Sequence, residues 1–361
     1  MTVVPSPAQP GAGLLRRRRR AALVLVMLAA SLIAVMMAGL TVGAASAPVL
    51  PIIASWFGFG GVHDLRAADV IILEQIRLPR IIMGAMVGAA LAVSGAILQA
   101  LFRNPLADPA IVGVSAGAVL GAVTVIVLGT ALFPGYVELA GAFAIPVAAF
   151  VGALIVTLLL YRLATSGGRT SVATLLLAGI AISAFGFALT GILIFLADDA
   201  QLRELTFWNL GSLAGATWQK VFAGGLVMLA SMAAIPFVAT ALNALALGEA
   251  AAGHMGIDVQ RMKNISILCV AGATGAAVAV SGGIGFVGII VPHLLRILIG
   301  PDNRFLLPAA ALLGGVFLML ADTISRTVVS PVELPIGIVT AIAGAPVFIL
   351  ILLRRRGVIG L

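Results

Sequence analysis

The chain has 361 residues, of which 62% are hydrophobic and only 9% are charged. A soluble domain carries about 25% charged residues, so this composition excludes a soluble enzyme, and the large apolar fraction excludes intrinsic disorder. The formal net charge is +8. Because the arginines flank apolar runs, this charge indicates orientation in a membrane, not nucleic-acid binding.

Long apolar runs predict an all-α polytopic membrane protein, because a membrane-spanning helix needs about 20 apolar residues. A polar tail, residues 1–20, ends in the run Arg16–Arg20. The apolar run after it ends in small residues and resembles a secretory signal, but its length favours an uncleaved first span. Ten spans are predicted, at residues 21–44, 81–102, 110–133, 139–161, 171–197, 221–242, 264–284, 286–299, 305–321 and 334–353.

Basic residues predict how these spans are oriented. Arginine clusters occur near both ends of the sequence, at Arg16–Arg20 and Arg354–Arg356. The positive-inside rule places both on the cytoplasmic side and therefore requires an even number of spans. We expect a single membrane domain over residues 21–356, with a cytoplasmic loop at residues 243–263.

Two segments of the sequence are nearly identical. Gly88–Ile97 reads GAALAVSGAI and Gly275–Ile284 reads GAAVAVSGGI, and a proline follows each at the same spacing, Pro105 and Pro292. The two predicted spans run in opposite directions, so the repeat is inverted. Inverted repeats are typical of transporters, and the small residues allow close approach of helices.

Three polar segments interrupt the apolar pattern. Residues 103–109 carry two prolines, which favour irregular backbone lining a pore or a tight cytoplasmic turn. Residues 242–263 include a short helix-forming stretch that suits docking to a cytoplasmic partner or a plain connection. In residues 198–213, Arg203 suits a transport pathway, or it pairs with a neighbouring acid, namely Asp198, Asp199 or Glu204.

Missing motifs narrow the class of transporter. The sequence has no Gly-x-x-x-x-Gly-Lys-Ser/Thr phosphate-binding loop, and no acidic residue lies in the middle of a predicted span. A proton-coupled carrier usually places such residues inside the membrane. We therefore expect the energy to come from another subunit, with no catalytic residue and no metal site in this chain; a self-sufficient secondary carrier is the alternative.

Several motifs in the same order resemble the iron-complex/vitamin B12 permease family of bacterial ABC importers, the FecCD type. They are RLPR (77–80), RNPLADP (103–109), LALGEAA (245–251), GFVGIIVPH (285–293), ELPIG (333–337) and GAP (344–346). The resemblance implies a ten-helix type II permease with an inverted repeat, working as a homodimer in the bacterial inner membrane. It also implies two ABC ATPase subunits, which bind the ATP and Mg, and a periplasmic substrate-binding protein.

The resemblance assigns roles to individual residues. An exposed cationic rim that docks the binding protein would consist of Arg77, Arg80 and Arg326. Contacts with the ATPase would come from Leu247, Gly248, Glu249, Ala250, Ala251 and Gly256. A cytoplasmic gate would consist of Asn104, Leu106, Thr170 and Ser171.

Residues 167–183 and 195–213 are similar to the haem-importing branch of the family, so the resemblance implies haem as the substrate. A ferric siderophore and cobalamin are the alternatives. The candidate substrate path is Arg203, Phe207 and Trp208. An arginine can hold a haem propionate with two hydrogen bonds, while the aromatic rings face the porphyrin.

Overall fold

The computed structural model describes residues 10–42, 48–56, 66–109, 113–166, 169–329 and 332–356. Within these ranges the chain is helical except for connecting segments and one two-stranded hairpin, β1 (Thr165–Ser166) paired with β2 (Arg169–Thr170). The predicted all-α class is confirmed. Parts of three predicted segments lie outside the described residues: 1–9 of the tail, 43–44 of the first span and 110–112 of the third.

The chain before the β hairpin forms seven α-helices, a π-helical turn and a 3-10 turn. These elements are α1 (Pro10–Thr41), α2 (Val49–Trp56), α3 (Ala67–Ile71), η2 (Ile72–Arg77), α4 (Leu78–Leu101), α5 (Val114–Leu132), α6 (Pro134–Ala140), η3 (Gly141–Phe143) and α7 (Ala144–Ala164). The helices after the β hairpin are α8 (Val172–Leu196), α9 (Asp199–Asn209), α10 (Trp218–Met232), α11 (Ile235–Leu245), α12 (Glu249–His254), α13 (Val259–Ser281), α14 (Val287–Ile299), α15 (Asn303–Thr327) and α16 (Ile336–Arg356).

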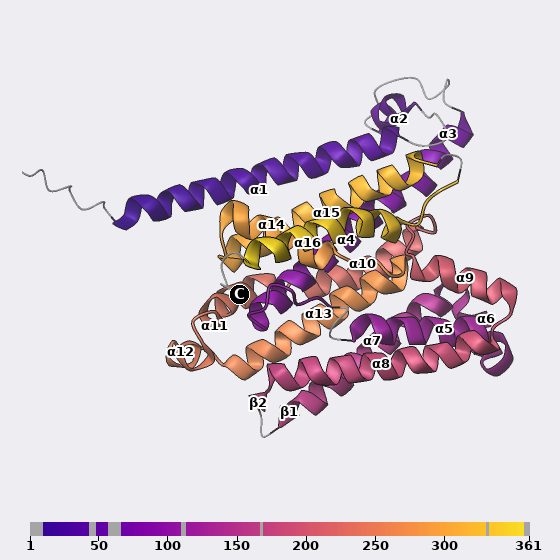
Figure 1. The fold of residues 1–361 in the computed structure, drawn as a ribbon. Helices are drawn as coiled ribbons and strands as arrows, with labels where there is room; N and C mark the ends of the chain where they lie inside the picture. The colour runs from indigo at the N-terminus through magenta and orange to yellow at the C-terminus, as the bar shows by residue number, and fades with distance from the viewer. Residues whose placement is uncertain are drawn as a thin grey trace, which may run out of the picture.

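The long helices run side by side between two ends of a bundle (Figure 1). Seven helical segments of the described chain are long and apolar enough to cross a membrane, or eight if the bent pair α10–α11 counts as one span. Helix α14 and residues 336–350 of α16 are apolar but shorter. Each of the ten predicted intervals thus contains a helix, and a polytopic membrane protein is confirmed, while the number of ten crossings stays a prediction.

The span expected at residues 221–242 is not one straight helix. Helix α10 ends at Met232 and α11 begins at Ile235, with an angle of 44° between them. Pro236 lies in the first turn of α11. Its ring removes a backbone donor and clashes with the carbonyl four residues earlier, which belongs to Met232. Pro236 therefore explains the break between α10 and α11, although the apolar run continues across it.

Helix α4 forms the centre of the bundle, and 78% of its apolar window is buried. Glycines allow its neighbours to approach closely. A Cβ atom added at Gly88 would lie 2.2 Å from the carbonyl oxygen of Gly314 on α15, and one at Gly95 would lie 2.0 Å from that of Gly288 on α14. Glycines thus allow the backbones of neighbouring helices to touch, and such close packing stabilises helix association in a membrane.

The first near-identical segment lies on α4, and the second covers the end of α13 and the three residues after it. Helices α4 and α13 pack against each other. Helix α4 also contacts α14 and α15, and α13 contacts α5 and α7. Gly88 faces α15, whereas Gly275 faces Phe150 and Ala153 of α7. The two prolines do not share a position, because Pro105 lies in the turn after α4 and Pro292 lies inside α14. The inverted relation of the halves stays a prediction.

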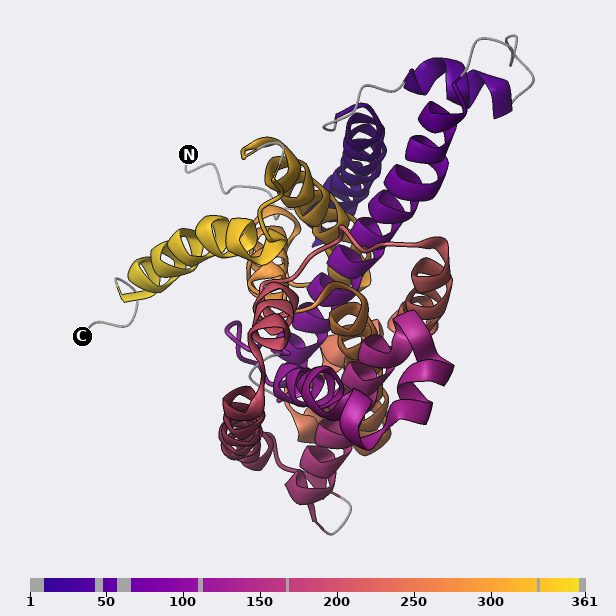
Figure 2. The same cartoon turned by 90° about the vertical axis from the view of Figure 1, so that its right-hand side faces the viewer.

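The two ends of the bundle carry different short elements. One end, which we call the inner end, holds α12 and the β hairpin, and the other, the outer end, holds α2, α3, α6 and α9 (Figure 1). Helix α1 lies along one side of the bundle, with only 6% of its apolar window buried. Helix α16 projects away from the bundle (Figure 2).

Candidate functional site

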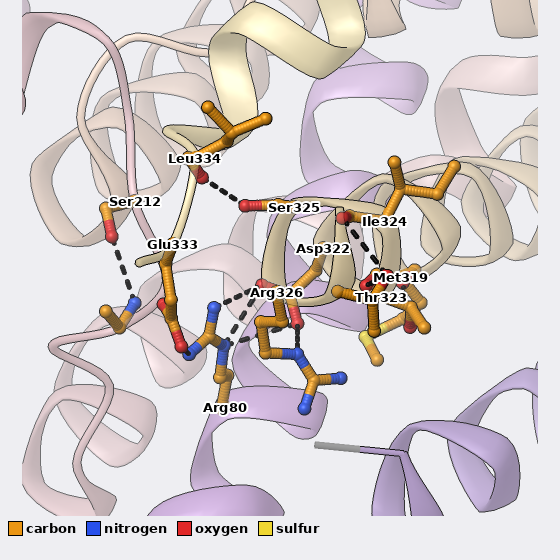
Figure 3. A network of polar contacts seen from close by, with 12 residues as sticks. Arg80, Ser212, Met319, Asp322, Thr323, Ile324, Ser325, Arg326, Glu333 and Leu334 are labelled. Atoms are coloured by element: carbon orange, nitrogen blue, oxygen red, sulfur yellow. Dashed lines mark hydrogen bonds and ion pairs between the residues drawn. The ribbon is translucent and has the colours of Figure 1, made fainter. Parts of the chain in front are cut away.

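A buried ionic cluster occupies the outer end of the bundle (Figure 3). Its centre is Asp322 on α15, whose Oδ1 accepts hydrogen bonds from Arg80 Nε at 3.0 Å and Arg80 Nη2 at 2.9 Å. Arg80 Nη1 also donates to Glu333 Oε1 at 2.9 Å. Arg326 Nε forms an ion pair with Asp322 Oδ2 at 3.1 Å. We call Arg77, Arg80, Asp322, Arg326 and Glu333 the arginine cluster.

The other members of the arginine cluster hold the end of α1. Arg77 Nη1 donates to the carbonyl oxygen of Leu40 at 2.5 Å, and Arg326 Nη1 donates to that of Val42 at 3.1 Å. The last carbonyl groups of a helix have no partner within the helix and carry the negative end of its dipole. Two guanidinium groups therefore compensate the end of α1.

The expected exposed cationic rim is not what the structure shows. It brings Arg77, Arg80 and Arg326 together, but they are only 5%, 7% and 8% exposed. The reason is the fully buried carboxylate of Asp322, which draws Arg80 and Arg326 inward. A carboxylate without a cation would be costly at this depth. A binding protein could therefore reach these arginines only if side chains of the cluster rearranged.

The arginine cluster contains three arginines and two carboxylates, which leaves a positive excess. Among the described residues, Arg326 Nη2 has no hydrogen-bond partner although it is buried. Glu333 is the accessible member, with a side chain 40% exposed. Sequence reasoning missed Asp322 and Glu333 as partners. The spacing of Asp322 and Arg326, four residues apart on one helix, was a usable signal for the first.

The π-helical turn η2 explains how the RLPR motif continues a helix despite Pro79. The backbone N–H of Leu78 bonds to the carbonyl oxygen of Leu73, five residues earlier. Pro79 then lies in the first turn of α4, where a missing N–H is tolerated. Helix is therefore continuous from Ala67 to Leu101, which begins well before the predicted start at residue 81.

The predicted ATPase-contacting residues form one projecting turn at the inner end. Gly248 and Gly256, with φ of 115° and 80°, flank α12. Ala252 is fully buried, whereas Leu247 is 72% exposed; Ala250 is exposed and Ala251 is half-buried. An ion pair joins α12 to α13, from Glu249 Oε1 to Lys263 Nζ at 2.8 Å.

The segment 103–109 is a tight turn. Asn104 Oδ1 accepts a hydrogen bond from the N–H of Leu106 at 3.0 Å, and the N–H of Asn104 donates to Gln99 at 3.1 Å. Both Asn104 and Leu106 are half-buried. Arg103 has a left-handed backbone with φ of 49°. A local turn thus explains the prolines, and the role of these residues as a gate stays a prediction.

The second predicted gate strip lies at the start of α8. Thr170 pairs with Thr165 in the β hairpin. Ser171 caps α8, and its Oγ accepts from the N–H of Thr174 at 3.3 Å. An N-terminal cap of this kind stabilises a helix. Ser171 therefore stabilises the start of α8. The gate role of Thr170 and Ser171 remains a prediction.

Helix α9 presents a polar and aromatic face at the outer end. Arg203 is exposed and, within the described ranges, forms no ion pair with Asp198, Asp199 or Glu204. Asp198 instead caps α9, accepting from the N–H of Gln201 at 2.8 Å. Arg203 is therefore available to a ligand, and the alternative of local pairing is not what the structure shows.

The aromatic residues of α9 lie on a groove. Phe207 is 57% exposed and Trp208 is half-buried. Both line a groove of about 320 Å³ together with Glu204, Lys220 and the end of α13, but Arg203 does not line it. Phe207 and Trp208 are thus brought together, whereas Arg203 lies beside the groove on the same helix.

Comparison with known proteins identifies the family. The FecCD transport family matches residues 30–354. The chain is 44% identical to the hemin transport system permease protein HmuU of Yersinia pestis, over 78% of this chain and 83% of that one. It is 45% identical to the cobalamin import system permease protein BtuC of Halobacterium salinarum, over 80% of this chain and 74% of that one.

Comparison with solved structures also indicates an ABC transporter permease. A metal-chelate type ABC transporter in an inward-facing conformation is similar with a TM-score of 0.79 and 29% identity, over 92% of this chain and 99% of that chain. PsaBC from Streptococcus pneumoniae, at 17% identity and a TM-score of 0.54, shares the fold. The chain therefore belongs to the FecCD transport family, the family of ABC importer permeases that its sequence motifs indicate.

Proposed function

We propose that this permease forms, as a homodimer, the path by which an ABC importer moves haem across the bacterial inner membrane. Two ATPase subunits would bind at the inner end and a periplasmic binding protein at the outer end. Arginines at the inner end, Arg17–Arg20 and Arg304 among them, support a cytoplasmic location for that end and for both termini. ATP and Mg belong to the ATPase subunits, and this chain carries no catalytic group.

The α9 groove is the observation that favours haem. Haem is a flat, apolar ring with two propionates, and a groove lined by Phe207 and Trp208 with Arg203 beside it offers matching chemistry. Two copies of α9 in a homodimer would supply two arginines for two propionates. Cobalamin is the second candidate, because relatives named for hemin and for cobalamin are about equally similar to this chain.

The projecting turn at α12 supports the proposed ATPase contact. A helix of one to two turns with Leu247 and Ala250 exposed is suited to fit a groove on a partner. Its backbone is held at both sides by glycines with positive φ and at its start by the Glu249–Lys263 ion pair. Movement of the ATPase subunits would then be transmitted to α13, the helix that carries Lys263.

Docking of the binding protein is proposed to act through the arginine cluster by exchange. A carboxylate from the binding protein would displace Glu333, the accessible acid, from Arg80. Asp322, which is buried, would remain in place. This arrangement keeps the arginines neutralised before docking and allows them to accept a second acid afterwards.

Uptake into proteoliposomes that contain the permease, its ATPase and its binding protein tests the substrate. Haem, a ferric siderophore and cobalamin are compared at equal concentration. Replacing Arg203 with alanine removes a hydrogen bond to a charged group worth about 1.5–3 kcal/mol, which corresponds to a loss of roughly tenfold or more in haem uptake. Basal ATP hydrolysis should not change.

The matched control is Arg66→Ala, which removes another exposed arginine at the outer end. Haem uptake at the wild-type rate in the Arg203→Ala variant contradicts the proposed path. Preferential uptake of cobalamin or a siderophore by the wild-type complex contradicts haem as the substrate and leaves the permease function intact.

A further inference from the structure

A strongly basic pocket at the inner end has no part in the proposed transport path. It has a volume of about 510 Å³ and lies between the start of α1, the end of α11 and the α14–α15 connection. Its charged lining residues are Arg17, Arg18, Arg20, Arg296, Arg304 and Asp302. Five arginines against one aspartate leave a positive excess that an anion would balance.

One wall of this pocket is fixed by polar contacts. Asp302 Oδ1 accepts from Asn243 Nδ2 at 2.6 Å, and Asp302 Oδ2 pairs with Arg304 Nη2 at 2.8 Å. Arg296 Nη1 donates to Gln99 Oε1 of α4. Asp302 is therefore already neutralised by a neighbouring cation, and its charge does not prevent an anion from entering.

The opposite wall is the start of α1. Arg17, Arg18 and Arg20 are exposed, whereas Ala21, one residue further, is only 2% exposed. Residues Arg16 and Arg19 point elsewhere, because they do not line the pocket. The helical repeat of 3.6 residues thus divides the arginine run into a pocket-lining set and a set on another face.

The pocket lies at the level where the polar surface of α1 gives way to its apolar, membrane-spanning part. The apolar run of α1 begins at Ala21, directly after the arginine run. Exposed apolar side chains follow directly, with Leu23 at 64% and Val26 at 67% on α1 and Ile297 at 66% on α14. A ligand with a charged head and apolar chains matches both parts, whereas a free anion matches only the arginines.

We propose that this pocket binds the headgroup phosphate of an anionic phospholipid, with its acyl chains along α1 and α14. Basic pockets between membrane helices at the cytoplasmic side are suited to anionic headgroups. The lipid would bridge the start of α1 to α14 and α15. The inference is independent of the substrate and of the partners proposed above.

The test compares two double variants of the purified, delipidated full chain. Arg17→Gln/Arg20→Gln removes two pocket-lining arginines, and Arg16→Gln/Arg19→Gln removes two from the same run outside the pocket. Both lose the same charge near the same span end, so any effect on insertion is matched. Native mass spectrometry measures retention of dioleoylphosphatidylglycerol against dioleoylphosphatidylcholine, and a thermal shift is recorded with each lipid and with inorganic phosphate.

Two basic residues at about 1 kcal/mol each correspond to roughly 30-fold in apparent affinity, so Arg17→Gln/Arg20→Gln should weaken phosphatidylglycerol binding by about that factor. The control variant should retain most of the wild-type affinity, and phosphatidylcholine should bind weakly to all three proteins. Equal losses in both variants would overturn the pocket. Equal stabilisation by inorganic phosphate alone would overturn a lipid as the ligand.

Discussion

Arg80 at the outer end and Lys263 at the inner end are both buried cations. They differ in how far apart in the sequence the segments lie that each one joins. Arg80 connects α4 to Asp322 on α15 and to Glu333 before α16, more than 240 residues along the chain. Lys263 connects α13 to Glu249, on the neighbouring α12. The outer end is thus held by long-range bonds, whereas the α12 turn pairs with its neighbour in sequence, and we expect it to move as a unit.

The largest expected effect concerns the centre of the arginine cluster. Replacing Asp322 with asparagine leaves two buried arginines without their shared carboxylate, and breaking a buried ion pair in this way costs about 3–5 kcal/mol. We expect the midpoint of thermal unfolding, measured by tryptophan fluorescence in detergent, to fall strongly, along with the yield of monodisperse protein.

Glu333→Gln is the matched control for that prediction. It makes the same change of charge on the same arginine, but the Glu333 side chain is 40% exposed, so the cost should be about 0–1 kcal/mol. Equal losses in the Asp322 and Glu333 variants would show that the outer end is not held together by its buried carboxylate.

The second prediction concerns the α12 turn. An arginine at Ala251, which is half-buried, places a bulky charge on the face proposed to contact the ATPase. We expect the variant to insert normally and to lose substrate-stimulated ATP hydrolysis in the reconstituted complex. Gly253→Ala, a small change at an exposed position of the same helix with open space around it, should retain activity. Normal transport by Ala251→Arg would rule out the contact.

The third prediction tests how firmly α12 is attached. Glu249→Gln removes the charge that faces Lys263, and because the Glu249 side chain is 48% exposed we expect a loss of about 0–1 kcal/mol of local stability. Hydrogen exchange of the backbone amides in α12 should accelerate while exchange in α4 does not change. Acceleration at both ends would mean that the turn is not a separate unit.

The smallest expected effect is a pH dependence at the inner end. Hydrogen bonds from Arg304 lower the pKa of Asp302 below its ordinary value of 3.8. A lowered pKa in the folded state means that this carboxylate stabilises the fold above pH 3.8 and loses that contribution as the pH falls through its folded pKa. Since the pair is partly exposed, the contribution is about 0–1 kcal/mol.

This contribution is measured as the difference in unfolding midpoint between the wild type and Asp302→Asn. The difference should be constant between neutral pH and about pH 5 and should shrink only below the ordinary aspartate pKa. A difference that shrinks between pH 7 and 5 would assign the effect to another group.

Local patterns in the sequence predicted what depends on local physics. Apolar runs located helix in every expected interval, and the glycines beside Glu249 indicated a separate short helix. The break between α10 and α11 was missed because Pro236 stands inside an apolar run that continues across it. Hydropathy reports which residues prefer a membrane, and it does not report the direction of a helix.

Long-range contacts limited the prediction of the site. An arginine near the end of a span, such as Arg80, reads as an interfacial residue, and its burial depends on a carboxylate that is 242 residues away in sequence. Phe207 and Trp208 were expected together because they are neighbours on one helix. The groove that they line is completed by α13 and Lys220, which no local pattern connects to them.

The two bonds that hold the end of α1 also set an order of events during synthesis. The carbonyl of Leu40 meets Arg77 only 37 residues later, so that bond is able to form as soon as η2 has emerged. The carbonyl of Val42 meets Arg326, which the ribosome adds 284 residues later. The first helix therefore enters the membrane early and waits for almost the whole chain before its attachment is complete.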